Sequence, residues 1–184
     1  MKTDHKTLLL ETAKNAIKFG LTKNITLPID PEEFDCALQK PRASFVTLHL
    51  EGVLRGCIGT LEAYQPLIID VAENAFNAAF RDPRFSALSL EEFPHLDYHI
   101  SILTPPSILE VTSEADLLNQ LRPNIDGVII KEGMKRGTFL PSVWEQLPDK
   151  KSFLTQLKLK AGFSPSYWSD NITIERYEVD SFSG

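Results

Sequence analysis

Residues 44–60 have the sequence SFVTLHLEGVLRGCIGT, and this stretch decides the fold. Ser44–Leu50 and residues 53–60 are rich in β-branched and large apolar side chains, which is typical of strands. Glu51 and Gly52 between them fit a two-residue turn. The pattern therefore predicts an antiparallel β-hairpin.

The turn determines which residues of the predicted hairpin face each other. It places Leu48 opposite Arg55 and Val46 opposite Cys57. Because side chains alternate between the faces of a strand, Arg55 and Cys57 are expected on one face, roughly 7 Å apart. A nearby guanidinium favours a thiolate, so the hairpin predicts a nucleophilic or redox-sensitive thiol. The alternative is a buried structural cysteine beside an edge-strand charge.

Helices and further strands are expected on both sides of the hairpin. Apolar residues at helical spacing predict helices over residues 4–19, with Gly20 as the stop, and from Pro66 to Phe80. Ser89 and Ser113 each open a capping-box pattern, so a short helix is expected after each. Strands are expected at residues 98–103, 128–131 and 172–182. Without a regular βαβ period, the pattern predicts an α/β (α+β) fold: one domain over residues 1–184, with helices packed on a mixed or antiparallel sheet.

Composition excludes several classes of protein. The chain of 184 residues carries 19 basic and 25 acidic side chains, a net charge of −6, which argues against nucleic-acid binding. Only two cysteines and no leader segment predict a reducing, cytoplasmic location. The apolar stretches are too short for a membrane helix. His49 and His99 are expected on neighbouring strands, but no metal-ligand spacing or glycine-rich phosphate loop is present, so no metal or cofactor is expected.

Arg81-Asp82-Pro83-Arg84-Phe85 is a second unusual cluster, directly after the predicted helix that ends at Phe80. Its two arginines either interact with the dipole at the helix C-terminus or bind a carboxylate or phosphate. Both interpretations remain open at this point.

Several motifs together are similar to those of the AMMECR domain family, known in bacteria and archaea as protein A of the AmmeMemoRadiSam system. They are LRGCIG at 54–59, Asn74-Ala75, AAFRDPRF at 78–85, FLPSVW at 139–144 and Lys160-Ala161-Gly162. The resemblance covers nearly the whole chain. It implies two unequal lobes, the larger holding both termini, with the hexapeptide at a cleft. It also implies a pathway shared with a Memo-like protein and a radical S-adenosylmethionine protein, but no established reaction.

Two functional hypotheses follow. The first is an enzyme, or one component of an enzyme system, that acts on a small anionic substrate through Cys57 as nucleophile or redox thiol and Arg55 as its activator. The alternative is a non-catalytic interaction module that presents this face to a partner of the same pathway. Carried over from the family, the remaining candidate residues for substrate binding are Gly56, Gly59, Asn74, Arg81, Asp82, Arg84 and Lys160.

Overall fold

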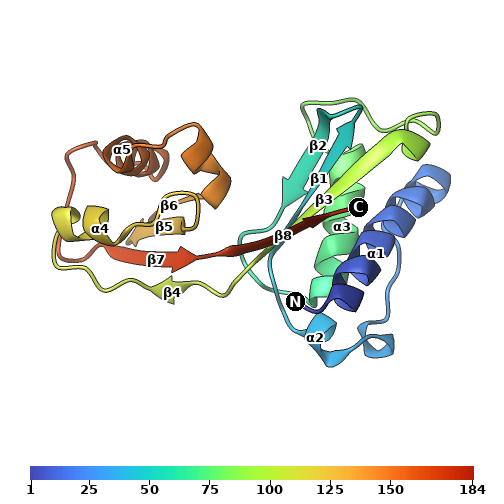
Figure 1. Ribbon diagram of the computed structural model, residues 1–184, viewed down its shortest axis with the longest axis horizontal. Helices are drawn as coiled ribbons and strands as arrows, with labels where there is room; N and C mark the ends of the chain where they lie inside the picture. The colour runs from blue at the N-terminus through green and yellow to red at the C-terminus, as the bar shows by residue number, and fades with distance from the viewer. The chain divides into compact units, whose positions relative to one another are not determined.

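A computed structural model describes residues 1–184, which form an α+β fold with two antiparallel four-stranded sheets (Figure 1). The chain divides into two compact units, each built around one sheet. The larger unit comprises Met1–Leu103 and Asp180–Gly184, and the smaller comprises Thr104–Val179. None of the helices combines the length and the apolar character needed to cross a membrane.

The larger unit contains a sheet with the strand order β2-β1-β3-β8. Helices α1 and α3 pack against each other, and both contact this sheet on its apolar face (Figure 1). The strands β3 and β8 are neighbours, although the whole smaller unit separates them in sequence. The elements are α1 (Thr3–Lys23), η1 (Pro31–Glu33), α2 (Cys36–Gln39), β1 (Ser44–Leu50), β2 (Val53–Gly59), α3 (Leu67–Phe80), η2 (Phe93–His95), β3 (Leu96–Leu103) and β8 (Val179–Ser183).

The first helix is longer than the sequence predicts. It continues to Lys23, and Asn24, with φ of 56°, ends it by donating its backbone N–H to the carbonyl of Gly20. Gly20 is buried, and a Cβ atom there would lie 2.5 Å from the ring of Phe80. The glycine therefore allows α1 and α3 to pack closely, and the prediction that it stops the helix is wrong.

The helix expected after Ser89 is absent, although its capping box forms. The N–H of Ser89 donates to the carboxylate of Glu92 at 2.8 Å, and the N–H of Glu92 donates to the Ser89 hydroxyl at 3.3 Å. Only the 3₁₀ turn η2 follows, because Pro94 lacks an N–H donor and β3 begins at Leu96. The capping bonds instead fix the position of the Glu92 carboxylate.

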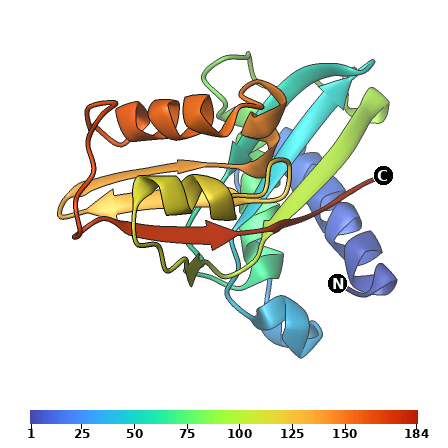
Figure 2. The ribbon, with the colours of Figure 1, turned by 60° about the vertical axis from the view of Figure 1, so that its left-hand side comes forward.

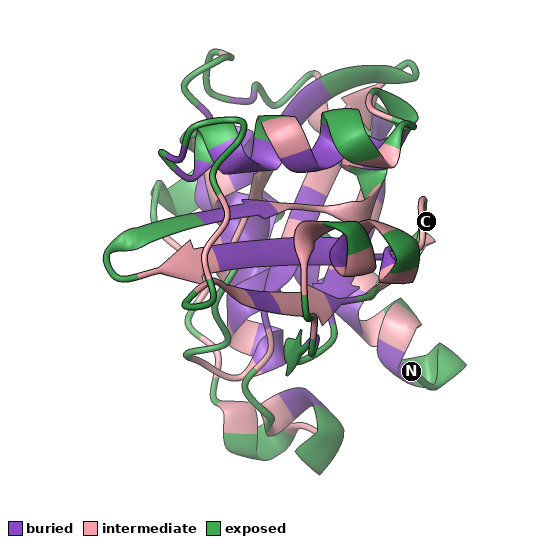
Figure 3. Ribbon diagram, turned by 90° about the vertical axis from the view of Figure 1, so that its left-hand side faces the viewer, coloured by how far each residue is buried: buried purple, intermediate pink, exposed green.

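The smaller unit has the strand order β4-β7-β5-β6, with α4 and α5 beside its strands (Figure 2). The inner side of α5 is buried and its outer side exposed, as Figure 3 shows. In the core the rings of Trp144 and Phe153 stack with centroids 3.7 Å apart. As predicted, Ser113 caps a helix. The elements are β4 (Ser107–Ile108), α4 (Glu114–Gln120), β5 (Gly127–Glu132), β6 (Lys135–Phe139), η3 (Pro141–Glu145), α5 (Lys150–Lys160) and β7 (Thr173–Tyr177).

Candidate functional site

The hairpin formed by β1 and β2 contains a β-bulge. Leu50 pairs with Val53, as the predicted turn requires, but Leu48 pairs with Gly56 and not with Arg55. Arg55 is therefore the extra residue of the bulged strand. The predicted pairing of Leu48 with Arg55 is wrong, because one additional residue enters β2 before the hexapeptide.

The bulge also changes the surroundings of Cys57, which lies opposite Thr47 and not opposite Val46. Gly56 faces α3, since a Cβ atom at this position would overlap the backbone carbonyl of Ala78. Side chains alternate along a strand, so the thiol of Cys57 points to the opposite face of the sheet. This face is only partly covered, and Cys57 is half-buried.

Because Leu54 pairs with His49 and Cys57 with Thr47 on one face of the hairpin, Arg55 projects with Gly56 from the other face, and it is only 9% exposed. Its Nε and Nη2 donate to the two carboxylate oxygens of Glu92 at 2.7 and 3.1 Å, and Nη2 also donates to the carbonyl of Ser86 at 3.0 Å. Its Nη1 is buried without an acceptor. The hydrogen bond from Arg55 is the main reason that the pKa of Glu92 falls to about 2. The expectation that Arg55 and Cys57 share a face is therefore wrong, and the charge of Arg55 is paired with Glu92.

Asp82 and Arg84 cover the outer edge of β2, which is an edge strand. The N–H of Cys57 donates to Asp82 Oδ2 at 2.9 Å, while Arg84 Nη2 donates to the carbonyl of Cys57 at 3.2 Å. Two further bonds, of 2.9 and 2.7 Å, join the Arg84 guanidinium to the Asp82 carboxylate. The hydrogen bond from Arg84 is the main cause that lowers the pKa of Asp82. These two side chains thus satisfy backbone groups that a neighbouring strand would otherwise bind.

A hydroxyl contacts the thiol of Cys57, and a cation binds the backbone of the same residue. Thr47 Oγ1 donates to Cys57 Sγ at 3.2 Å. The pKa of Arg84 is raised, chiefly by its hydrogen bond to Asp82 and further by the charge of Asp82. The side chain of Arg84 is 54% exposed, so part of the guanidinium is open to solvent. The cation bonded to the backbone of Cys57 is therefore Arg84, which the sequence suggested only as a ligand-binding residue.

Two histidines lie on the same face of the sheet as Cys57. His99 on β3 is directly opposite Thr47, and His49 is opposite Asp97. Burial, and to a smaller extent the charge of His49, lowers the pKa of His99. No group of three or more histidine, cysteine or acidic side chains could hold a metal ion. The sequence suggested these two histidines only as metal ligands. Their cross-strand position could not be predicted, because it depends on the register of β1 with β3.

Asn74 and Gly59 have packing roles in this structure. The buried amide of Asn74 donates to the carbonyl of Ser44 and to Asp70 Oδ2, both at 3.0 Å. A Cβ atom on Gly59 would overlap the ring of Phe45. Burial raises the pKa of Asp70, which hydroxyl and amide groups surround. Asn74 therefore joins α3 to β1 within the core and does not reach the thiol.

Arg81 and Lys160, the two other candidate cations, are exposed. The guanidinium of Arg81 lies 5.0 Å from the ring centroid of Phe76 in the larger unit. The ammonium of Lys160 lies 5.0 Å from the ring centroid of Phe139 in the smaller unit. Their proposed role as binding residues for an anion stays a prediction, as does the cleft at the hexapeptide.

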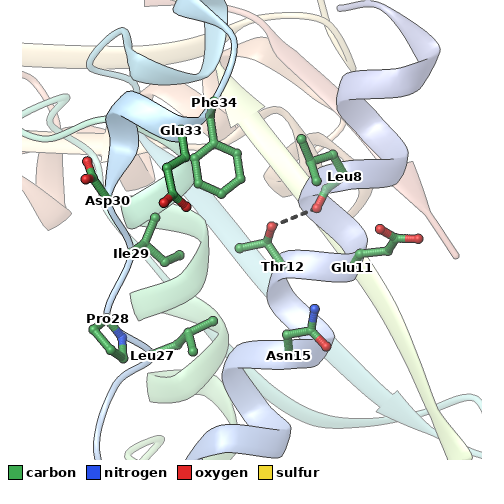
Figure 4. Close-up of a pocket in the computed structure, with 10 residues that line it drawn as sticks. All are labelled: Leu8, Glu11, Thr12, Asn15, Leu27, Pro28, Ile29, Asp30, Glu33 and Phe34. Carbon is green, nitrogen blue, oxygen red and sulfur yellow. Dashed lines mark hydrogen bonds between the residues drawn. The ribbon is translucent and has the colours of Figure 1, made fainter.

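A pocket of about 260 Å³ lies elsewhere in the larger unit, between α1 and residues 27–34 (Figure 4). Its lining combines apolar side chains such as Leu27 and Phe34 with acidic ones such as Glu33. The hydroxyl of Thr12 donates to the carbonyl of Leu8 at 2.8 Å within α1 (Figure 4). The lining includes none of the candidate site residues and no cysteine or histidine.

Comparisons with known proteins agree with one another. The model of the AMMECR1 family matches residues 10–182. A protein from Methanothermobacter thermautotrophicus is 38% identical over 99% of this chain and 95% of its own length. One from Thermotoga maritima is 39% identical over 94% of this chain and 93% of its own length. The crystal structure of the uncharacterized protein PH0010 from Pyrococcus horikoshii superposes with a TM-score of 0.81 at 30% identity, covering 96% of this chain and 89% of that one.

Proposed function

The chain belongs to the AMMECR1 family, and we propose that it acts as an enzyme, or as one component of an enzyme system, on a small anionic substrate through Cys57. One observation carries this proposal. The sulfur accepts a hydrogen bond from Thr47 at 3.2 Å, and the guanidinium of Arg84 is held at the same residue by its bond to the backbone carbonyl of Cys57 at 3.2 Å. Both neighbours stabilise negative charge on sulfur, and the thiolate is the nucleophilic form of cysteine.

Arg84 has two roles in this proposal. Its bonds to Asp82 fix the guanidinium beside β2, while its solvent-exposed part receives a carboxylate or phosphate oxygen of the substrate. An anion bound there lies close to the thiolate, which forms a bond to an electrophilic centre of the same molecule as the bond from that centre to its leaving group breaks and the leaving group departs with the electron pair. Arg84 thereby takes the activating role that the sequence gave to Arg55.

The pathway forms part of the proposal. A Memo-like protein and a radical S-adenosylmethionine protein are expected to supply or consume the substrate. We place the activity in the cytoplasm, where a free thiol stays reduced. Both cysteines, Cys36 and Cys57, are unpaired.

The experiment compares alkylation of Cys57 by iodoacetate, which is an anion, with alkylation by neutral iodoacetamide, in a Cys36→Ser background. Arg84→Gln is expected to lower the iodoacetate rate relative to the iodoacetamide rate about fivefold, because two unit charges about 4 Å apart in water interact by about 1 kcal/mol. Arg136→Gln, at an exposed arginine of β6 that is not a candidate site residue, is the matched control and leaves the ratio unchanged. A ratio that Arg84→Gln does not alter contradicts the proposed anion site.

The alternative function, an interaction module, is tested with the same chain. Cys57→Ser is compared with the unmodified protein for co-purification with the Memo-like protein and with the radical enzyme. Unchanged binding together with lost pathway activity supports catalysis. Lost binding, combined with a thiol no more reactive than free cysteine, supports the module.

A further inference from the structure

Thr47 occupies the centre of a row of three side chains that crosses three strands. It lies directly opposite Cys57 of β2 and directly opposite His99 of β3. Residues directly opposite each other in antiparallel strands project from the same face of the sheet. Thiol, hydroxyl and imidazole therefore stand side by side on the face that points away from α3.

The backbone explains why the hydroxyl and the thiol are in contact. The N–H and carbonyl of Cys57 point outward to Asp82 and Arg84. The pair of Cys57 and Thr47 is thus of the non-hydrogen-bonded type, in which opposite side chains are closest. The contact of 3.2 Å between Thr47 Oγ1 and Cys57 Sγ agrees with this geometry. The backbone polar groups of Thr47 consequently face β3, where His99 is its partner.

The ring of His99 has no hydrogen-bond or ion-pair partner. The titratable groups nearest to it on this face are His49, diagonally across on β1, and Asp97, two residues earlier on β3. Strand β8 adds serines, and Ser181 contacts Ser101 at 2.9 Å. Burial lowers the pKa of His99 and so favours the uncharged ring, in which one nitrogen has a free lone pair.

We propose that His99 accepts the thiol proton of Cys57 through the hydroxyl of Thr47. This inference rests on the proposed function, because it supplies the thiolate that the reaction needs. The S–H bond breaks and its proton passes to Thr47 Oγ1, while the hydroxyl proton of Thr47 passes to a ring nitrogen of His99. The electron pair stays on sulfur, and the products are a thiolate and an imidazolium. Thr47 ends as a hydroxyl that donates to sulfur, which is the hydrogen bond seen in the structure.

The test measures the rate of alkylation of Cys57 by neutral iodoacetamide between pH 5.5 and 9 in the Cys36→Ser background. This rate reports the thiolate directly and does not require knowledge of the substrate. His99→Gln and Thr47→Val are each expected to slow alkylation at pH 7 by about tenfold or more, because a cysteine without a proton acceptor is only a few per cent thiolate at this pH. Both variants also lose the part of the pH profile that follows imidazole titration. Thr47→Ser, which keeps the hydroxyl, restores the rate to within about twofold.

His49→Gln is the matched control, because His49 lies on the same face but is not opposite Thr47. It is expected not to slow alkylation. Unchanged rates in His99→Gln or Thr47→Val, or an equal loss in His49→Gln, overturn the inference. Thermal unfolding checks each variant, and His99→Asn serves the same test if His99→Gln does not fold. Iodoacetamide carries no charge, so failure here leaves the dependence of the iodoacetate rate on Arg84 as a separate test of the proposed function.

Discussion

Replacing Glu92 with glutamine removes one half of the ion pair that joins β2 to the segment after α3. The variant keeps the shape of the side chain but loses its charge. Arg55 then remains a cation that is 9% exposed, and its Nη1 already has no acceptor. Removing one partner of such a pair is strongly destabilising, because the other charge stays buried and uncompensated.

The pKa of Glu92 gives the magnitude. It falls from 4.5 to about 2, chiefly because Arg55 donates to the carboxylate. Each pKa unit corresponds to about 1.4 kcal/mol, so the folded state gains at most about 3 kcal/mol from the charged carboxylate. The side chain of Glu92 is 27% exposed, and solvent screening reduces this gain. Glu92→Gln is therefore expected to lower the free energy of unfolding by about 2 to 3 kcal/mol at pH 7.

The sign of the pH dependence is a sharper test. A carboxylate with a lowered pKa stabilises the folded state fully above its unfolded pKa, and this contribution is lost as the pH falls through the folded value. The difference between the unmodified protein and Glu92→Gln is thus expected to close between pH 4.5 and about 2. Urea unfolding followed by circular dichroism measures it, with Glu91→Gln as an exposed control. A difference that is the same at pH 7 and near pH 2 would refute the reasoning. Replacing both partners, as Arg55→Met with Glu92→Leu, is expected to recover most of the loss.

Three further substitutions test other parts of the structure. Gly56→Ala places a Cβ atom against the carbonyl of Ala78 and is expected to lower the free energy of unfolding by about 2 kcal/mol or more in urea titrations. An unchanged midpoint of urea unfolding contradicts the close approach of β2 to α3. Asp82→Asn removes the charge that fixes Arg84 and is expected to destabilise the fold by about 2 kcal/mol at pH 7. Because the pKa of Asp82 is lowered, that loss shrinks in acid, which the same titrations at low pH check. Lys158→Met replaces a buried ammonium, bonded to a half-exposed Glu114 at 2.8 Å, by hydrocarbon. It is expected to change the free energy of unfolding by less than about 1 kcal/mol, whereas a loss of several kcal/mol would show that the ion pair itself stabilises the unit.

The elements of the hairpin and of α3 are predictable from local patterns of apolar residues and turn signals. The register inside the hairpin is not, since the bulge depends on contacts with distant parts of the chain. Gly56 approaches the backbone of Ala78, and Arg55 pairs with Glu92, 37 residues further along. Gly56 was the one indication of the bulge in the sequence, because a glycine inside a strand often marks a bulge or a close backbone approach.

The neighbours of Cys57 in the candidate site were also not predictable from the sequence. Cys57 could be singled out from sequence, but a shift of one residue in register exchanges all of its neighbours. Thr47 therefore replaces Val46 opposite the thiol, and Arg84 replaces Arg55 as the nearby cation. Thr47 and His99 carry no motif of their own, so only the paired strands identify them.

The neighbouring positions of β3 and β8 make the smaller unit an insertion within a sheet of the larger one. The two ends of this insertion are held together, since Thr104 and Glu178 exchange two hydrogen bonds of 2.8 Å. During synthesis the ribosome releases β8, the fourth strand of the larger sheet, only after the entire inserted unit. We therefore expect β3 to be an unprotected edge in the nascent chain until β8 emerges. A short turn from Leu103 to Asp180 is the natural replacement for the insertion if it is excised.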